Sequence, residues 1–150
     1  MNYRVKFVFV SIATLILSIA GCASGTVSID DLDISISDLQ KAVHESLPAK
    51  SRGQSASGRE FKTVYFVQKK GEFEEVEGGL YRSYASIEIH GDRRPYSIVV
   101  QVPVEKRTSE GHYELFKYDE GTARVITRRI QKALHERRED RNIIDDFRAF

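Results

Sequence analysis

The chain has 150 residues, of which 23 are lysine or arginine and 22 are aspartate or glutamate, so its formal net charge is +1. This length, with 41% apolar residues, is that of one ordinary globular domain. The balanced charge argues against a dedicated nucleic-acid-binding protein, which normally carries a concentrated basic surplus. A single cysteine excludes an intramolecular disulfide framework and a zinc site built from several cysteines.

The amino-terminal segment differs sharply from this average. Arg4 and Lys6 precede an uncharged apolar run over residues 7–20. A membrane-spanning helix needs about 20 apolar residues, whereas this shorter run fits the hydrophobic region of a secretory signal. The next positions complete the tetrapeptide Ile-Ala-Gly-Cys at residues 19–22, which resembles the lipobox of bacterial lipoproteins.

The resemblance to bacterial lipoproteins implies a processing pathway. In that family the cysteine thiol receives a diacylglyceryl group, a dedicated peptidase cleaves before the cysteine, and the new amino terminus is acylated. We therefore expect residues 1–21 to be a signal peptide, cleavage between Gly21 and Cys22, and fatty acids such as palmitate on Cys22. Ala23 stands where an aspartate retains such proteins in the inner membrane, so the resemblance implies the outer membrane, with the domain facing the periplasm. The alternative is an incidental Cys22 beside an ordinary cleavage site.

The remaining residues predict a single domain. We expect residues 22–29 to hold the acylated cysteine and a short linker, and residues 30–150 to form one α+β unit. The alternation of polar and apolar residues over 33–36 favours a short edge strand or an extended lead-in. Because the linker is short, the domain is expected to sit close to its membrane.

A short helix and a loop are expected next. Ser37 and Gln40 have the spacing of a capping box, and the apolar residues that follow predict a helix over 38–47 that Pro48 ends. Residues 49–58 contain no apolar side chain larger than alanine, which favours a loop.

The middle of the chain favours β-strands separated by turns. The strand segments are rich in aromatic and β-branched residues or alternate apolar with polar residues, and they are residues 61–68, 81–89, 96–104 and 112–118. Residues 71–79 are interpreted as a turn with an acidic tip, and residues 91–95 and 108–111 as further turns.

The final third is predicted to be helical. Thr122 is a candidate N-cap for a helix with a buried stripe formed by Val125, Ile126, Ile130, Ala133 and Leu134. Residues 135–142 contain no apolar side chain. Apolar residues then return at helical spacing and predict a second stripe.

Together these elements predict an antiparallel sheet of three to four strands with helices packed on one face, an α+β two-layer sandwich. In element order the domain is similar to the lipopolysaccharide-assembly lipoproteins, in which a helix, several strands and a closing helix form a sandwich. This similarity concerns layout alone, so it implies an assembly role by analogy and assigns no functional residue.

The motifs of common catalytic and metal sites are incomplete in this chain. His135 begins a sequence like the zinc-protease helix motif, but Glu139 stands where the second histidine is required. The acidic turn lacks the residue alternation of a calcium loop, and neither a nucleophile elbow nor a phosphate loop occurs. We expect no catalytic residue, no metal, no cofactor and no small-molecule substrate.

Two surfaces near the carboxy terminus are candidate binding sites. Basic residues outnumber acidic ones in the first, which is a candidate contact for anionic lipid headgroups, lipopolysaccharide phosphates or an acidic partner and comprises Arg124, Arg128, Arg129, Lys132, Arg137 and Arg138. Its alternative is a solvent-exposed helix whose charges pair with one another. The second surface is the apolar set Ile143, Ile144, Phe147 and Phe150. Chain ends are usually polar, so this set is expected either to fold back onto the sheet or to dock onto another envelope protein.

The sequence therefore predicts an outer-membrane-anchored periplasmic lipoprotein with a non-enzymatic assembly or scaffolding role. Its expected partners are the membrane, through the lipid anchor, and another envelope protein. The alternative function is a binding module for an anionic envelope component, through the basic carboxy-terminal helix.

Overall fold

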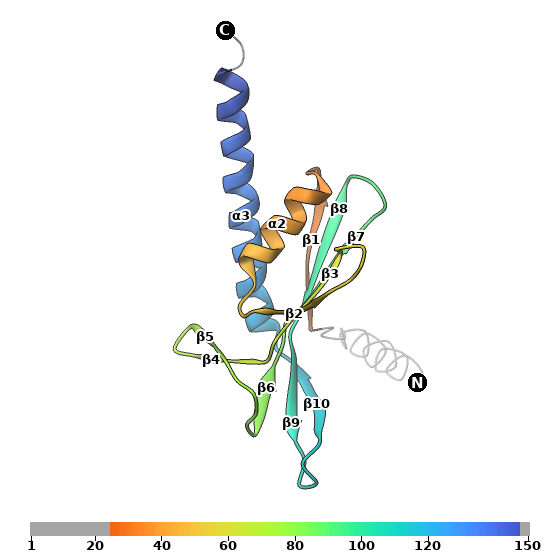
Figure 1. Cartoon of the computed structure of the whole chain (residues 1–150), viewed down its shortest axis with the longest axis vertical. Coiled ribbons are helices and arrows are strands. Elements are labelled where there is room, and N and C mark those ends of the chain that lie inside the picture. Colours follow the sequence, from red (N-terminus) through yellow and green to blue (C-terminus); the bar gives the residue numbers. More distant parts are fainter. Residues whose placement is uncertain (1–24, 148–150) are drawn as a thin grey trace, which may run out of the picture.

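The structure is a computed structural model that describes residues 25–147, with side chains described as far as residue 139. The described residues form two helices and ten strands (Figure 1). In chain order these elements are β1 (Thr26–Leu32), α2 (Ile36–Ser46), β2 (Ser51–Gln54), β3 (Glu60–Thr63), β4 (Phe66–Lys69), β5 (Glu72–Glu75), β6 (Tyr81–Ser83), β7 (Ser86–His90), β8 (Tyr96–Gln101), β9 (Pro103–Arg107), β10 (Tyr113–Tyr118) and α3 (Glu120–Phe147).

The strands form two antiparallel sheets of five strands each. The first sheet has the order β1-β8-β7-β3-β2 and the second has the order β10-β9-β6-β4-β5. The expected α+β class is thereby confirmed, whereas the expected single sheet of three to four strands is wrong. Three of the four expected strand segments are each divided into two strands, and the fourth forms β10 alone. Two polar segments expected to be a loop and a turn form the outer strands β2 and β5.

Three strands of the first sheet continue almost directly into strands of the second. Residues 64–65 separate β3 from β4, residues 84–85 separate β6 from β7, and Val102 separates β8 from β9. We call these residues the junction. Backbone hydrogen bonds from Thr63 N to Ala85 O (3.1 Å) and from Tyr84 N to Pro103 O (3.3 Å) cross it. The two sheets are therefore halves of one bent surface.

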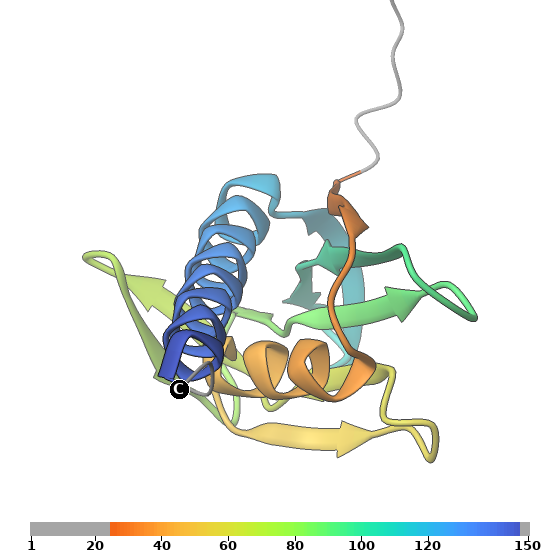
Figure 2. The ribbon, with the colours of Figure 1, turned by 90° about the horizontal axis from the view of Figure 1, so that it is seen from above.

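The first sheet carries the hydrophobic core on one face. Its register aligns four apolar residues from four adjacent strands in one row, Val27, Val100, Ile87 and Phe61. Buried side chains of α2 and α3, among them Leu39 and Ile130, belong to the same cluster. The two helices lie against each other on this side of the sheet, as the view from above shows (Figure 2). The opposite row, on the open face, is Ser28, Val99, Glu88 and Glu60.

Several expected boundaries differ from the structure near the amino-terminal end. Residues 26–29, expected to be linker, form most of β1, where they pair with β8. Helix α2 begins two residues early, because Ser35 rather than Ser37 is the N-cap and its Oγ accepts a hydrogen bond from Asp38 N at 3.2 Å. Ile36 packs against the core, which accounts for the longer helix. The helix ends before Pro48, as expected.

The carboxy-terminal third forms one helix. Asp119 supplies the cap expected from Thr122, since its Oδ1 accepts a hydrogen bond from Thr122 N at 3.0 Å. The predicted buried stripe is confirmed: its members are all buried or half-buried along α3. The helix continues without interruption to Phe147, and its last turns rise past the strands (Figure 1). Neither described helix has the length and apolarity needed to span a membrane.

Candidate functional site

Several sequence-predicted site residues fall outside the described part of the chain. Gly21, Cys22 and Phe150 precede or follow the described residues. The backbone of Ile143, Ile144 and Phe147 belongs to the last turns of α3, but their side chains are not among those described. The lipid anchor and the apolar docking set therefore stay predictions.

The basic residues of α3 do not form one free positive surface. Arg124 donates to Glu120 from its Nε at 3.1 Å, and Lys132 pairs with Glu136 at 3.7 Å. Arg137 contacts Glu45 of α2, so its charge is used between the two helices. The other members are exposed, and the Cζ of Arg129 lies 4.8 Å from the ring centroid of Phe73. Arg128 and Arg138 have no ion pair among the described side chains. Among the described side chains, two of the six basic residues therefore pair within α3, one pairs with α2, and the other three have no ion pair.

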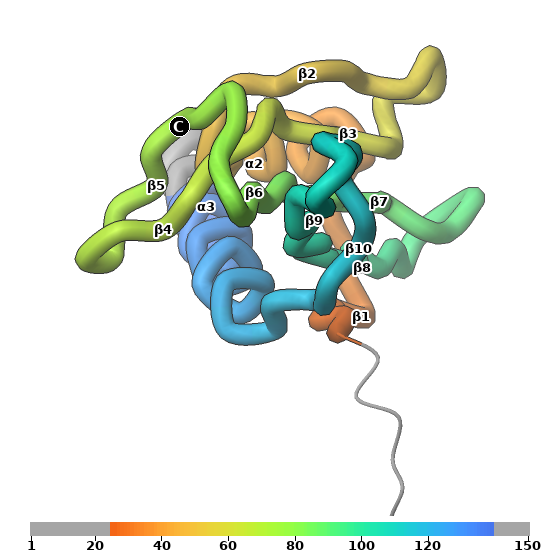
Figure 3. Tube along the Cα trace, turned by 90° about the horizontal axis from the view of Figure 1, so that it is seen from below, coloured from red at the N-terminus to blue at the C-terminus, as the bar shows by residue number. Residues whose placement is uncertain are grey.

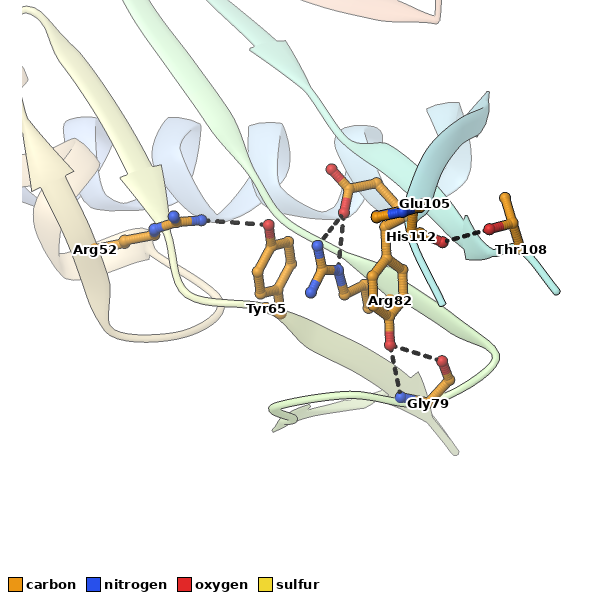
Figure 4. A network of polar contacts seen from close by, with 8 residues as sticks. Arg52, Tyr65, Gly79, Arg82, Glu105, Thr108 and His112 are labelled. Carbon is orange, nitrogen blue, oxygen red and sulfur yellow. Dashed lines mark hydrogen bonds and ion pairs between the residues drawn. The ribbon is translucent and has the colours of Figure 1, made fainter. Parts of the chain in front are cut away.

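A different arrangement of side chains lies on the open face at the junction (Figure 4). Arg82 of β6 faces Glu105 of β9 directly across the strand pair. Its Nε and Nη2 both contact the same carboxylate oxygen, Oε2 of Glu105, at 2.8 Å and 2.7 Å. The Arg82 Cζ also lies 3.7 Å from the ring centroid of Tyr65 and 3.5 Å from that of Tyr113. We call these four residues the arginine stack.

The arginine stack is largely shielded from solvent, and hydrogen bonds hold the ring of Tyr113 in place. The side chains of Arg82 and Glu105 are only 16% and 20% exposed, so water screens their attraction less than at an open surface. The Tyr113 hydroxyl donates to Gly79 O at 2.8 Å and accepts from Gly79 N at 3.1 Å. Each ring contact with the guanidinium contributes about 0.5–2 kcal/mol. The stack therefore fixes both tyrosine rings without burial in an apolar core.

A cleft of about 470 Å³ lies beside the stack on this open face. It combines tyrosine rings with backbone and charged groups, and its lining includes Arg52, Gln54, Glu60, Lys62, Tyr65 and Tyr84. Strand β2, at the edge of the first sheet, supplies one wall. The Arg52 Nη1 donates to the Tyr65 hydroxyl at 3.3 Å, which joins this wall to the stack. The volume is within the range of ordinary ligand sites.

Tyr84 also lines the cleft. Its ring meets that of Tyr65 edge to face, with centroids 5.9 Å apart. Burial raises the pKa of the Tyr84 hydroxyl, and the negative charge of Glu105 raises it further. The hydroxyl is therefore neutral at physiological pH and able to donate a hydrogen bond to an occupant of the cleft.

Charged side chains of both signs lie at the rim of the cleft. Exposed Arg52 and Lys62 stand near exposed Glu60, so the rim offers charges of both signs. The Glu105 carboxylate, which also lines the cleft, is held by Arg82. Among the side chains described, no three histidine, cysteine, aspartate or glutamate groups gather as metal ligands would.

Sequence reasoning missed the arginine stack. Arg82 and Glu105 alternate with apolar residues along their strand segments, and this alternation is a usable signal for an outward-facing position. Their contact depends on the register of β6 with β9, and Tyr65 depends on the break between β3 and β4. Neither the register nor the break can be predicted from a local sequence pattern.

No protein-family model and no curated protein matches this chain.

Proposed function

We propose that this protein is a lipoprotein of the bacterial outer membrane, anchored through acylated Cys22, with its domain in the periplasm. The Ile-Ala-Gly-Cys motif at residues 19–22 supports the anchor. The described domain supports a close attachment, because strand β1 begins at Thr26. A chain extends at most about 3.3–3.6 Å per residue, so four residues hold the domain within about 14 Å of the lipid-bearing cysteine.

We further propose that the domain acts without catalysis, as an assembly or scaffolding protein that binds another envelope protein in the junction cleft. The observation that carries this proposal is the pair of tyrosines, Tyr65 and Tyr84, held on an open face beside rim charges of both signs. Tyrosine and arginine are enriched at protein-binding surfaces, where a fixed aromatic ring loses little conformational freedom on binding. Such a cleft suits a polar segment of a partner protein.

The geometry favours this function over binding of an anionic component through α3. Three of the basic side chains proposed for that role are used in ion pairs with Glu120, Glu136 and Glu45. Their positive charge is therefore largely compensated within the domain. Glutamine in place of both Arg128 and Arg129 should leave retention on anionic vesicles unchanged at low and high salt.

The anchor is tested by Cys22→Ser in cells supplied with a labelled fatty acid. The unaltered protein should incorporate the label and fractionate with the outer membrane, whereas the variant should incorporate none. Labelling of the variant would refute the anchor.

The cleft is tested by placing a photoreactive amino acid at Glu60 in the full-length protein and irradiating intact cells. Glu60 lies on the open face and lines the cleft. Ser28, in the same register row but three strands away, is the matched control position. We expect a crosslinked envelope protein from position 60, none from position 28, and loss of the product when Lys62→Glu reverses a rim charge. Equal products at both positions would contradict the proposal.

A further inference from the structure

The described residues leave a group of large apolar side chains in solvent at one end of the second sheet. Their exposed fractions are 41–61%, and they are Leu80, Tyr81, Leu115, Phe116 and Tyr118. Three of them belong to β10, an edge strand, and the others lie in or directly before β6. We call this group the β10 patch. Exposure of so many large apolar side chains together indicates a contact surface.

The β10 patch is organised rather than loose. The rings of Tyr81 and Phe116 lie with centroids 5.5 Å apart. The Lys106 Nζ lies 6.0 Å from the first centroid and 5.9 Å from the second. The hairpin that carries Phe116 is closed by Thr108, whose backbone N and Oγ1 both donate to His112 O. An aromatic pair therefore stands beside an exposed ammonium group on a well-formed hairpin.

The start of the domain lies against the same strand. A Cβ added to Gly25 would be 2.2 Å from the Tyr118 Cβ, so the Gly25 backbone rests directly on β10. Figure 3, seen from below, shows β1 beginning beside the segment that joins β10 to α3. Gly25 is the third residue after Cys22, and three residues extend at most about 10–11 Å. The acyl chains on Cys22 would therefore enter the membrane close to Tyr118.

We infer that the β10 patch rests on the phospholipid surface that the acylated Cys22 enters, and so fixes the orientation of the domain on its membrane. This inference rests on the proposed lipid anchor. Phe116 is two residues from Tyr118, about 7 Å along the strand, which is within reach of the same membrane surface.

The chemistry of the patch fits a lipid headgroup region. Tyrosine favours this region because its ring is apolar and its hydroxyl is polar, whereas leucine and phenylalanine enter the acyl boundary. Lys106 and Lys117 can place their ammonium groups at headgroup phosphates while their stems follow the apolar surface. Glu114 of the same strand is exposed and faces the same environment, so the attraction to lipid depends on apolar contact more than on net charge.

The chain contains no tryptophan, which makes a single introduced tryptophan a clean reporter. The experiment uses the mature acylated protein reconstituted in phosphatidylethanolamine–phosphatidylglycerol vesicles with brominated acyl chains. Phe116→Trp reports on the patch. Arg93→Trp is the matched control, because it is exposed in the turn between β7 and β8, at the far end of β8 from the start of β1.

We expect quenching of Phe116→Trp to exceed that of Arg93→Trp by about threefold, because only the patch reaches the acyl region. Equal quenching of the two variants, or quenching of neither, would overturn the inference. Circular dichroism verifies folding, and Tyr81→Trp replaces Phe116→Trp if that variant is unfolded. Fatty-acid labelling of each preparation tests the anchor separately, so a labelled protein without selective quenching refutes the patch alone.

A photoreactive residue at position 116 in intact cells distinguishes the other occupants. A phospholipid adduct supports the inference. A crosslink to a second copy of this chain or to another protein, without a lipid adduct, overturns it in favour of that occupant.

Discussion

The two sheets of this domain are stabilised by different interactions. The first sheet buries apolar rows beneath α2 and α3, whereas five of the six residues of β10 in the second sheet are exposed. At the tip of the second sheet, order depends on the arginine stack and on the hydroxyl of Tyr113. The comparison indicates that single changes of surface charge have little effect on the stability of the first sheet, because buried apolar area stabilises it. Loss of one charged side chain, Arg82, is expected to destabilise the outer part of the second sheet.

The largest effect is expected in the first sheet. Phe61→Ala removes a ring that is 1% exposed from one end of the core row. We expect the free energy of unfolding to fall by about 3–5 kcal/mol, because transfer and cavity costs add. Chemical denaturation measures the change. The neighbouring exposed Lys62→Ala is the control, and it should change stability by less than about 0.5 kcal/mol.

A smaller and more local effect is expected from Arg82→Ala. The change leaves the Glu105 carboxylate without its partner and separates two tyrosine rings, so we expect a loss of about 2–4 kcal/mol. Hydrogen exchange should accelerate in β9 and β10 and stay nearly constant in β7 and β8. Arg107→Ala, an exposed arginine on the same strand as Glu105, serves as the control. A uniform acceleration across both sheets would show that the stack stabilises the whole domain equally.

The smallest effect concerns Tyr84. Its folded-state pKa is raised by burial and by Glu105, so folding favours the neutral phenol. This contribution is fully present below the unfolded pKa near 10 and is lost as the pH rises through the higher folded value. Subtracting the ultraviolet titration of Tyr84→Phe from that of the unaltered protein isolates this hydroxyl. We expect its midpoint above that of free N-acetyltyrosinamide; a midpoint at or below it would contradict the buried environment.

The sequence allowed accurate prediction where burial is periodic. The alternation from Tyr96 to Val104 identified a row that is buried at every expected position, including Val102 at the junction. The same alternation gives no sign of the bend at the junction, because inward-facing residues are buried on both sides of it. Strands β2 and β5 were missed because polar segments such as Ser51–Gln54 are extended by pairing with neighbours rather than by their own propensity.

The candidate site was less predictable than the fold. Arg82, Glu105 and Tyr113 come from three strands, and their contacts depend on register and on a turn that brings Gly79 to the Tyr113 hydroxyl. The basic residues of α3 were visible as a charge surplus. Their partner Glu45, however, is 92 residues from Arg137, so compensation of that charge could not be read from the helix alone.

The pairing of β1 with β8 also determines when this domain can fold. Thr26 pairs with Gln101, so the segment nearest the proposed anchor finds its neighbour only 75 residues later. A chain that emerges with its amino terminus first must expose β1 until β8 has followed. Closure over such a separation is slow compared with local hairpin formation. The first sheet is therefore completed late, only after β7 and β8 provide the edge that β1 joins.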